Sequence, residues 1–555
     1  MAASILSTCV ADTFAAPPII FGAEILSTDV APVLNMTQSA THGIRLTQPD
    51  ANVENVDFCN VTVTYTHPGT EDRVIVETWL PAKENWNERY HAAGGGGFSA
   101  GRFFLSYGIM IGAIGEGYVT STTDGGLGLN AADSSTYVLR SPGNVDQYAL
   151  RNFASVSLND QAVISKSLAN TFYGKPPVYS YWNGCSQGGR QGLMLAQRYP
   201  EAYDGISAAA PAIELPTLLA TLFWPQQQMN MLGEYPYMCE MDAIAVAAIA
   251  ACDGLDGVVD GVISDVEGCV ASFDPAELVG TLTLCSQTDS EVEISSAAAA
   301  VMKGLWSGVV SDKGERISNP YTPGSDFTGV SFGAPGIAVT DCLRNSSSAS
   351  MPDVSGQWVS PLDAKDPNLD IGRCKGAPHI FGQQYLQLWV GKDPTLDLRK
   401  LTLEKFIEMV REGAQEYGSL FATNDPDLSR FRDAGGKMIT FHGVADSYIP
   451  IGNTLDYYER VMSHLPDTRD FYRFFKVPGL DHCFGGTGGQ PTAIFDQLRA
   501  WVENGTVPES SPVSFTDSQG VDWNRVLCPF PQESRYSTEC GDATAAQCWS
   551  CTENS

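Results

Sequence analysis

A five-residue segment in the first half of the chain has the pattern of a serine nucleophile on a sharp turn. Residues 184–188 read GCSQG, which matches G-x-S-x-G with Ser186 at the centre. A β-prone run over 178–182 precedes the motif, and a run with helical spacing over 191–199 follows it. Such a turn holds the serine hydroxyl above the edge of a sheet, and the flanking glycines relieve the crowding that a Cβ causes. We predict that Ser186 is a catalytic nucleophile; the alternative is an ordinary Gly/Ser turn.

A serine hydroxyl attacks a carbonyl only when a base removes its proton, so a histidine and an orienting acid are required. In folds built around this turn, the acid and then the histidine follow late strands of the sheet. His482 comes after a β-prone run over 471–477. Asp446 lies four residues beyond another such run, which ends at His442, a residue expected to be buried. We predict that His482 is the general base and that Asp446 orients it; Asp481 is a competing acid, but adjacent side chains rarely orient one another well.

Acyl transfer also requires hydrogen-bond donors directed at the oxygen that becomes negative in the transition state. The backbone N–H of Gln187, directly after the nucleophile, is one such donor by position. The glycine run over 94–97 follows a short β-prone stretch, which is where the second donor is expected. We predict that Gly95 or Gly96 completes the oxyanion hole; the alternative is a flexible turn.

Two of the fourteen cysteines stand directly beside the proposed catalytic residues. Cys185 precedes Ser186, and Cys483 follows His482. A disulfide between them joins two positions far apart in the chain and limits the distance between nucleophile and base, on which general-base catalysis depends. We predict this bridge; the alternative is two unrelated structural cysteines.

The cysteine count and the N-glycosylation sequons bear on the compartment. An even number of scattered cysteines, a low charge density and four Asn-x-Ser/Thr sequons favour an oxidising compartment and up to seven disulfides. The sequons are at Asn35, Asn60, Asn345 and Asn504. The first twenty residues contain no basic stretch followed by an apolar one, so no secretory signal is visible in this chain. We nevertheless predict a secreted glycoprotein, with Cys9–Cys59 as the N-terminal disulfide.

The spacing of apolar residues predicts alternating β and α segments at both ends of the chain. Residues 59–80 alternate on both sides of a Pro-Gly turn, which indicates two adjacent strands, and 160–172 has helical spacing. Such alternation is typical of a mainly parallel sheet covered by helices. The middle differs, with many Gly, Pro and Asp turns and only intermittent helices. We predict an α/β core in two halves, 1–211 and 419–555, with a lid inserted over 212–418 and a cysteine-rich tail at the end.

The overall charge excludes two classes of partner. The chain has 33 Lys and Arg against 64 Asp and Glu, for a formal net charge of −31, and only 17% of its residues are charged. Such an acidic protein repels phosphate backbones and anionic lipid surfaces. No stretch approaches the roughly 18 uninterrupted apolar residues of a membrane span. We expect neither nucleic acid nor a membrane as a partner.

These motifs together resemble those of the tannase and feruloyl esterase family of secreted serine esterases. The resemblance rests on Cys185-Ser186, Asp446 and His482-Cys483. Further matching segments are 184–190 (GCSQGGR), 93–98 (AGGGGF), 433–437 (DAGGK), 471–475 (FYRFF) and 501–505 (WVENG). The resemblance implies an α/β-hydrolase core with a large lid, and hydrolysis of esters of aromatic acids.

The resemblance also implies a structural calcium ion in the lid. Residues 253–262 read DGLDGVVDGV, so three carboxylates that repel one another alternate with glycines. Calcium binds six to eight oxygens, and the D-x-D-x-D-G spacing of an EF-hand is absent. The implied ligands are the carboxylates of Asp253, Asp256 and Asp260 and the carbonyls of Val258 and Val262, with Cys252 and Cys269 closing the loop as a disulfide. The alternative is an acidic, solvated turn.

We therefore expect a carboxylic ester hydrolase that acts on small-molecule or polysaccharide-linked aromatic esters, feruloyl (hydroxycinnamoyl) esters above all. The alternatives are a tannase acting on galloyl esters, a small-molecule esterase of a biosynthetic pathway, and a catalytically silent binding module stabilised by calcium. Either aromatic acid needs an aromatic slot, for which Phe223, Trp224 and Tyr235 of the lid are candidates. The sequence is compatible with a monomer or a homodimer.

Overall fold

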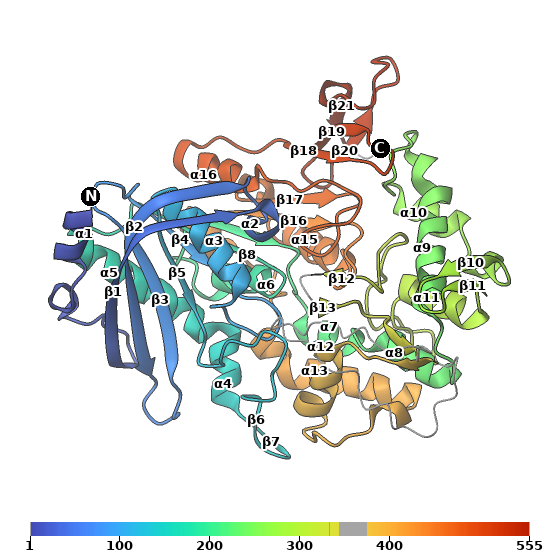
Figure 1. Cartoon of the computed structure of the whole chain (residues 1–555), viewed down its shortest axis with the longest axis horizontal. Coiled ribbons are helices and arrows are strands. Elements are labelled where there is room, and N and C mark those ends of the chain that lie inside the picture. Colours follow the sequence, from blue (N-terminus) through green and yellow to red (C-terminus); the bar gives the residue numbers. More distant parts are fainter. Residues whose placement is uncertain (1, 332–333, 343–373, 554–555) are drawn as a thin grey trace.

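The computed structural model describes residues 2–331, 334–342 and 374–553, and its centre is a nine-stranded sheet (Figure 1). The strand order is β1-β2-β3-β5-β4-β8-β9-β16-β17. The strands are β1 (Glu24–Ala40), β2 (Ala51–Thr66), β3 (Val74–Pro81), β4 (Arg89–Ala93), β5 (Val119–Thr123), β8 (Tyr179–Cys185), β9 (Gly205–Ala209), β16 (Lys437–Gly443) and β17 (Tyr472–Val477). The first three strands and β5 pair antiparallel, and the strands from β5 to β17 pair parallel. The predicted mainly parallel sheet is confirmed, and so are the two adjacent strands on either side of the Pro-Gly turn.

Helices cover both faces of this sheet. They are α3 (Phe104–Gly115), α5 (Ser157–Tyr173), α6 (Gln187–Arg198), α15 (Gly452–His464) and α16 (Ile494–Asn504). Successive side chains of a strand point to opposite faces. Accordingly, Trp182 of β8 packs in the cluster that includes α5, α6 and α15, whereas its neighbour Tyr181 packs in the cluster that includes α3 and α16. Shorter elements of the core are α1 (Ala2–Thr8), α2 (His42–Arg45), β6 (Leu139–Ser141), β7 (Asn144–Val145), α4 (Gln147–Arg151) and α14 (Ser429–Asp433).

The chain between β9 and β16, which we call the lid segment, contributes no described residue to the large sheet. Its helices are α7 (Leu215–Thr221), α8 (Trp224–Leu232), α9 (Met238–Cys252), α10 (Val266–Ser272), α11 (Ser296–Ser307), α12 (Ile380–Gln384) and α13 (Leu403–Phe421). Its short strand pairs are β10 (Leu282–Cys285) with β11 (Ser290–Glu293), β12 (Val330–Ser331) with β13 (Ala334–Pro335), and β14 (Thr340–Cys342) with β15 (Cys374–Gly376). The segment is more helical than expected, because α9 (MCEMDAIAVAAIAAC) is apolar on nearly every side and shows no helical period.

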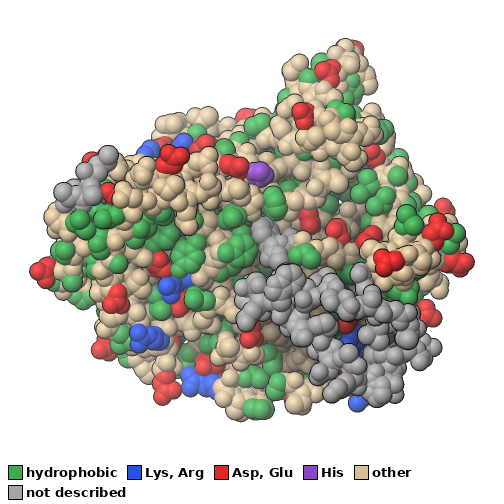
Figure 2. Space-filling view, in the orientation of Figure 1, with side chains coloured by type: hydrophobic (Ala, Val, Ile, Leu, Met, Phe, Trp, Pro, Cys, Tyr) green, Lys and Arg blue, Asp and Glu red, His purple; other side chains and the backbone are tan. Residues whose placement is uncertain are grey.

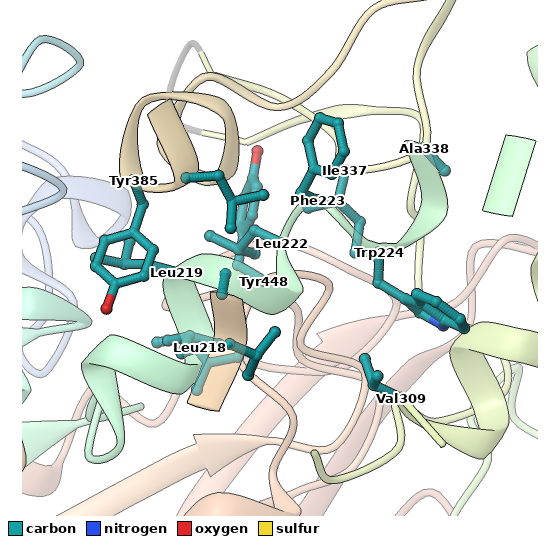
Figure 3. Packing of buried hydrophobic residues seen from close by; sticks show 14 of the residues in the cluster. Leu218, Leu219, Leu222, Phe223, Trp224, Val309, Ile337, Ala338, Tyr385 and Tyr448 are labelled. Atoms are coloured by element: carbon teal, nitrogen blue, oxygen red, sulfur yellow. The ribbon is translucent and has the colours of Figure 1, made fainter. Parts of the chain in front are cut away.

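The hydrophobic cluster of the lid segment also includes residues from both halves of the core. Figure 3 shows Leu218, Leu219 and Leu222 of this cluster close to Tyr385 and to Tyr448, which follows β16. The same cluster contains Phe98 and Phe153 from the first half of the chain. Burial of apolar surface therefore joins the lid segment to the core over a broad area.

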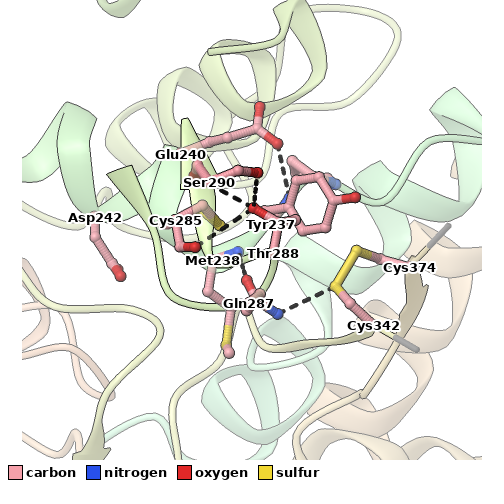
Figure 4. Close-up of a disulfide and its surroundings, with 12 residues drawn as sticks. Tyr237, Met238, Glu240, Asp242, Cys285, Gln287, Thr288, Ser290, Cys342 and Cys374 are labelled. Carbon is pink, nitrogen blue, oxygen red and sulfur yellow. Dashed lines mark hydrogen bonds between the residues drawn. A yellow bond between two sulfur atoms is a disulfide. The ribbon is translucent and has the colours of Figure 1, made fainter. Parts of the chain in front are cut away.

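Seven disulfides pair all fourteen cysteines, the maximum that the sequence allowed. The expected bridges Cys9–Cys59, Cys185–Cys483 and Cys252–Cys269 are among them. The pairings left open are Cys239–Cys285, Cys342–Cys374, Cys528–Cys551 and Cys540–Cys548. In Figure 4, Gln287 donates a hydrogen bond to Cys342 Sγ at 3.1 Å, beside the Cys342–Cys374 bridge.

The C-terminal tail forms two hairpins, which project at the top of Figure 1. They consist of β18 (Ser511–Thr516) with β19 (Asp522–Leu527), and β20 (Glu533–Tyr536) with β21 (Trp549–Thr552).

Acidic side chains outnumber basic ones over the face shown in Figure 2, as the net charge of −31 requires. In the described part of the chain, no helix has both the length and the apolar character to cross a bilayer.

Candidate active site

The turn between β8 and α6 holds Ser186 in a strained conformation. Ser186 has φ 62° and ψ −121°, in a region that a residue with a side chain rarely adopts. Its N–H donates to Ala209 O at 3.0 Å, and Arg190 N–H donates to Ser186 O at 2.9 Å, so hydrogen bonds secure both sides of the turn. A Cβ on Gly184 would lie 2.6 Å from the backbone of Gly188. Only glycine at this position lets the turn close.

The imidazole of His482 connects Ser186 to Asp446. His482 Nε2 lies 2.9 Å from Ser186 Oγ, and His482 Nδ1 lies 3.1 and 2.9 Å from the two carboxylate oxygens of Asp446. The three residues follow β8, β16 and β17, whose carboxyl ends lie at the same edge of the parallel sheet. This arrangement can pass the serine proton to the imidazole while the carboxylate orients the ring and stabilises its charge.

The side chain of Asp446 is completely enclosed and heavily hydrogen-bonded. The backbone N–H groups of Tyr448 and Ile449 donate to Asp446 Oδ1 at 2.9 and 2.7 Å, and His442 Nε2 lies 3.2 Å from Oδ2. Burial by itself would raise the pKa of Asp446, but the charge of His482 and the hydrogen bonds of His442 and His482 hold it below its usual range. Burial opposes the charged form of His482, yet the Asp446 carboxylate outweighs it and raises the pKa of His482.

Asp481, the competing acid, is directed elsewhere. Its Oδ1 accepts hydrogen bonds from the N–H and the hydroxyl of Ser447, at 2.9 and 2.7 Å. Burial and the charge of Asp446 raise the pKa of Asp481 to about 6. Of the two carboxylates, Asp446 is the one within hydrogen-bond distance of the His482 ring.

The Cys185–Cys483 disulfide joins the nucleophile turn to the histidine loop. The two Cα atoms are 6.0 Å apart, within the usual range, although 298 residues separate them in sequence. Cys483 has φ 62°, so the backbone has a positive φ at the nucleophile itself in the turn and at the residue after His482 in the loop. The bridge therefore limits how far Ser186 and His482 can separate.

In the glycine run, neither Gly95 nor Gly96 offers the free donor that was predicted to complete the oxyanion hole. Gly95 N–H donates to Gln191 Oε1 at 2.8 Å, and Gly96 N–H donates to Ser99 O at 3.2 Å. Neither N–H is free in this conformation, because Ser99 O accepts from Gly96 and Gln191 of α6 accepts from Gly95. That long-range contact leaves no trace in the spacing of the sequence.

Gln187 and Gly97 have backbone N–H groups that remain available as donors. Gln187 is the first residue of α6, where backbone N–H groups have no acceptor within the helix. Gly97 has φ 54° and is partly exposed, unlike its buried neighbours in the run. Its N–H forms no hydrogen bond with the described part of the chain.

A buried arginine, which sequence analysis did not single out, secures the first turn of α6. Arg190 is completely buried, and its Nε donates to Gln187 Oε1 at 2.8 Å. Its terminal nitrogens donate to the carbonyls of Phe153 and Ala154 in the π-helix η2 (Asn152–Val156), at 3.1–3.3 Å, and to Phe421 O of α13 at 3.4 Å. Burial lowers its pKa to about 9, so the guanidinium is charged at neutral pH. Arg190 thus connects the nucleophile helix to the lid segment.

A series of ring contacts runs from the catalytic imidazole into the lid segment. The Tyr448 ring meets the His482 ring edge-on, with 5.1 Å between centroids, and lies 5.2 Å from the ring of His379. The His379 ring lies 5.0 Å from the ring of Phe381. Phe381 Cζ is in turn 2.7 Å from the place that a Cβ on Gly97 would take. Neither His379 nor Phe381 stands out in the sequence, because their connection to His482 through Tyr448 depends on how the lid segment packs.

The aromatic residues proposed for the substrate slot lie mainly in the lid's own core. Phe223 and Trp224 are 1% and 8% exposed and pack against Phe406, with centroid distances of 6.5 and 5.8 Å. The hydroxyl of Tyr235 donates to Asn230 Oδ1 at 3.0 Å. Phe381, which is partly exposed, is an aromatic side chain of the lid segment that does reach the glycine run.

The predicted calcium loop folds around its carboxylates. The two oxygens of Asp253 accept hydrogen bonds from the N–H groups of Asp260 and Gly261, both at 2.9 Å. Asp256 Oδ1 accepts from Val258 N–H at 2.9 Å, and Asp260 Oδ1 accepts from Val262 N–H at 3.2 Å. The Cys252–Cys269 disulfide closes the loop, as expected.

The charges of this loop are only partly balanced. Asp260 is buried and contacts Arg525 of β19, which lies over the Trp549 ring. Burial and the charges of Asp253 and Asp256 nevertheless raise the pKa of Asp260 to about 7. Crowded carboxylates of this kind fit a hard cation chemically. Over the described ranges, however, no three or more His, Cys, Asp or Glu side chains converge in the geometry of a metal site.

A mainly parallel sheet with a serine on the turn after β8, an acid after β16 and a histidine after β17 defines an α/β-hydrolase. The sequence profile described as "Tannase and feruloyl esterase" matches residues 59–552. The chain belongs to this family and is a carboxylic ester hydrolase, which confirms the resemblance seen in the motifs.

Individual relatives support this assignment over nearly the whole chain. The chain is 33% identical over 545 residues to a "Probable feruloyl esterase" of Arthroderma benhamiae, covering 97% of this chain and 93% of that protein. It is 31% identical over 501 residues to a "Tannase" of Aspergillus oryzae, covering 86% and 83%. Among solved structures, the "Tannin acyl hydrolase from Aspergillus niger" superposes with a TM-score of 0.81 at 28% identity, covering 99% of this chain and 96% of that one.

Proposed function

We propose that the protein hydrolyses esters of hydroxylated aromatic acids, feruloyl (hydroxycinnamoyl) esters above all, with Ser186 as nucleophile. The observation that carries this proposal is the 2.9 Å contact between Ser186 Oγ and His482 Nε2, with Asp446 on the other ring nitrogen. The Arthroderma benhamiae relative named a probable feruloyl esterase supports the choice of acyl group.

The reaction proceeds in two steps that use the same three side chains. His482 Nε2 takes the proton of Ser186 as the hydroxyl attacks the ester carbonyl, and Asp446 stabilises the imidazolium. The backbone N–H groups of Gln187 and Gly97 donate to the oxyanion. The imidazolium then protonates the leaving alcohol, and water, activated by the same base, hydrolyses the acyl-enzyme.

A labelling experiment and a substrate comparison test this proposal separately. A fluorophosphonate probe should label wild-type protein at Ser186 and should not label the Ser186→Ala variant, whose thermal melt should stay unchanged. Appreciable hydrolysis by Ser186→Ala would remove this serine from its role. Steady-state hydrolysis of methyl ferulate and methyl gallate then measures the acyl preference, which we expect to favour ferulate.

Galloyl esters are the second candidate, and the Aspergillus oryzae relative named a tannase favours them. Higher kcat/KM on methyl gallate than on methyl ferulate would establish this alternative. A small-molecule esterase of a biosynthetic pathway would cleave neither model ester efficiently, although the probe would still label Ser186. A catalytically silent binding module would resist the probe.

Calcium belongs to this proposal as a structural ion of the lid segment. The carboxylates of Asp253, Asp256 and Asp260 would hold it, together with the carbonyls of Val258 and Val262. When bound, the ion neutralises charges that otherwise repel one another in a partly buried loop. Support comes from the raised pKa of Asp260 and from the excess of three carboxylates over the one charge of Arg525 among the described residues of this site.

We further propose that the protein works outside the cell as a glycoprotein. Seven disulfides are typical of an oxidising compartment. Asn35 and Asn504 are exposed and accessible to a glycan, whereas Asn60 is half-buried and donates to Glu77 Oε1 at 3.1 Å. The fourth sequon, at Asn345, lies outside the described residues. The protein is predicted to be a monomer or a homodimer, and light scattering would distinguish the two.

A further inference from the structure

His379, on the lid side of the active site, is a buried polar side chain that nothing in the proposed mechanism uses. Its side chain is completely enclosed, and neither ring nitrogen has a hydrogen-bond partner among the described residues. A buried polar atom without a hydrogen-bond partner destabilises the folded protein relative to a paired one. Such groups are rare enough in folded proteins to need an explanation, and a ligand that supplies the missing partner is one explanation.

The position of His379 places it within reach of a bound ester. One of its ring neighbours, Tyr448, contacts the catalytic His482, and the other, Phe381, lies against Gly97 of the glycine run. Phe381 and Gly97 are partly exposed, and so is Ser186. The imidazole therefore lies directly behind the accessible surface around the nucleophile. The charge of His482 also acts on it, second to burial, which is consistent with this proximity.

The chemistry of the imidazole selects the kind of group that it can accept. Burial and the charge of His482 lower the pKa of His379 to about 3, so the ring is neutral under ordinary conditions. A neutral imidazole presents one N–H donor and one nitrogen acceptor. A hydroxyl group is likewise both a donor and an acceptor, whereas a carboxylate accepts only and is best matched by a charged donor. The ring is therefore suited to a hydroxyl and poorly suited to an anion.

We propose that His379 is a substrate-binding residue whose imidazole forms a hydrogen bond with a hydroxyl group of the bound ester. The proposal rests on the esterase function given above and extends it, because it assigns the recognition of a hydroxylated substrate to one lid residue. The hydroxyl belongs either to the aromatic ring of the acyl part or to the alcohol part. The two sources share the same chemistry, and the choice of substrates separates them.

A second orphaned imidazole provides an internal control. His91 of β4 is also completely buried, with both ring nitrogens unpaired among the described residues and a pKa lowered by burial to about 3. Its ring stacks on Phe495 of α16 at 4.3 Å and meets Tyr118 edge-on. All three of these rings are buried, and neither Tyr118 nor Phe495 belongs to the series of ring contacts that runs from His482 to Phe381. His91 therefore represents a histidine buried for packing alone.

The test compares pairs of esters that differ by one hydroxyl group. Methyl 4-hydroxycinnamate against methyl cinnamate varies the acyl part, and 2-hydroxyethyl benzoate against ethyl benzoate varies the alcohol part. Wild-type protein should show a higher kcat/KM for the hydroxylated member of one pair. The His379→Phe variant keeps a ring but removes both nitrogens. Its kcat/KM for the hydroxylated ester should be roughly 10- to 100-fold below that of wild type, whereas its kcat/KM for the ester without the hydroxyl should change by less than about threefold.

Two further variants separate recognition from structural damage. His379→Gln retains a donor and an acceptor and should keep most of the hydroxyl preference even if it is less stable. His91→Phe should change the melting temperature without changing the preference. The proposal would be overturned if His379→Phe lowered kcat/KM equally for both esters of each pair, or lowered it for neither. It would also be overturned if wild-type protein had the same kcat/KM for the esters with and without the hydroxyl.

A binding measurement distinguishes failure of this proposal from failure of the proposed function. Calorimetry on the Ser186→Ala variant measures the affinity for the same esters without turnover. A preference for the hydroxylated ester that disappears in the Ser186→Ala, His379→Phe double variant supports the role of His379, whether or not the wild type hydrolyses that ester. Equal affinity for both members of each pair removes that role while leaving the esterase function intact.

Discussion

The core side and the lid side of the active site differ in how their polar groups are paired. On the core side, Asp446 accepts from two backbone N–H groups and faces two imidazoles, and His482 has a partner on each ring nitrogen. On the lid side, His379 is equally buried and has no partner among the described residues. Groups that move protons must stay in one geometry, which saturated hydrogen bonding provides. Groups that recognise a substrate need hydrogen-bonding atoms that have no partner within the protein.

The largest expected effect comes from breaking the pairing on the core side. Asp446→Asn should lower kcat roughly 10³- to 10⁴-fold, because the amide no longer holds the imidazole in the required tautomer. The carboxylate raises the pKa of His482, so its loss should also move the acidic limb of the kcat/KM–pH profile to lower pH. Hydrolysis of methyl ferulate from pH 4 to 9 measures both. A decrease of less than tenfold would contradict the role of Asp446.

Removal of the Cys185–Cys483 bridge should have the next largest effect. The Cys185→Ser, Cys483→Ser variant should lose about 2–5 kcal/mol of unfolding free energy, since the bridge closes a loop of 298 residues. Its kcat should also fall at temperatures where the protein is still folded, because nucleophile and base are less well aligned. Denaturant melts and kcat measure the two effects. The Cys540–Cys548 bridge in the tail, with a separation of only 8 residues, is the matched control and should leave kcat unchanged.

Chelation should affect the lid segment more than the core. If calcium binds the loop over 253–262, EDTA should lower the unfolding free energy by about 2–4 kcal/mol, as expected for a ligand present at 100–1,000 times its Kd. Thermal melts with EDTA, and again after addition of Ca²⁺ or Mg²⁺, measure the shift. The Asp260→Asn variant should respond to EDTA much less than wild type. Unchanged melting temperature and activity after chelation would contradict the calcium site.

The smallest expected effect comes from Asp481, the neighbour of His482. Its charge contributes, after that of Asp446, to the raised pKa of His482, so Asp481→Asn should move the acidic limb slightly to lower pH. We expect kcat to stay within about threefold, because Asp481 bonds Ser447 rather than the imidazole. The same pH series as for Asp446→Asn measures the shift. A loss as large as that of Asp446→Asn would reverse the assignment of the two acids.

The sequence predicts the structure best where a motif and a strand pattern agree. The G-x-S-x-G turn required a strand before it and a helix after it, and β8 and α6 are in those places. Local spacing failed for the lid segment, where α9 is apolar on nearly every side and its period is hidden. Local spacing also failed for the glycine run. The Gly95 N–H is not free because Gln191, which lies on α6, accepts a hydrogen bond from it.

The sequence by itself determined the chemistry of this protein: a serine, a histidine and an acid in the order of one fold, with cysteines beside two of them. Those signals are local, because turn geometry and strand ends depend on neighbouring residues. Only the tertiary structure decided which groups face one another, such as Arg190 with the carbonyls of η2 and α13, or His379 behind Phe381. Burial and pairing result from packing between segments hundreds of residues apart, and no short window of sequence contains that information.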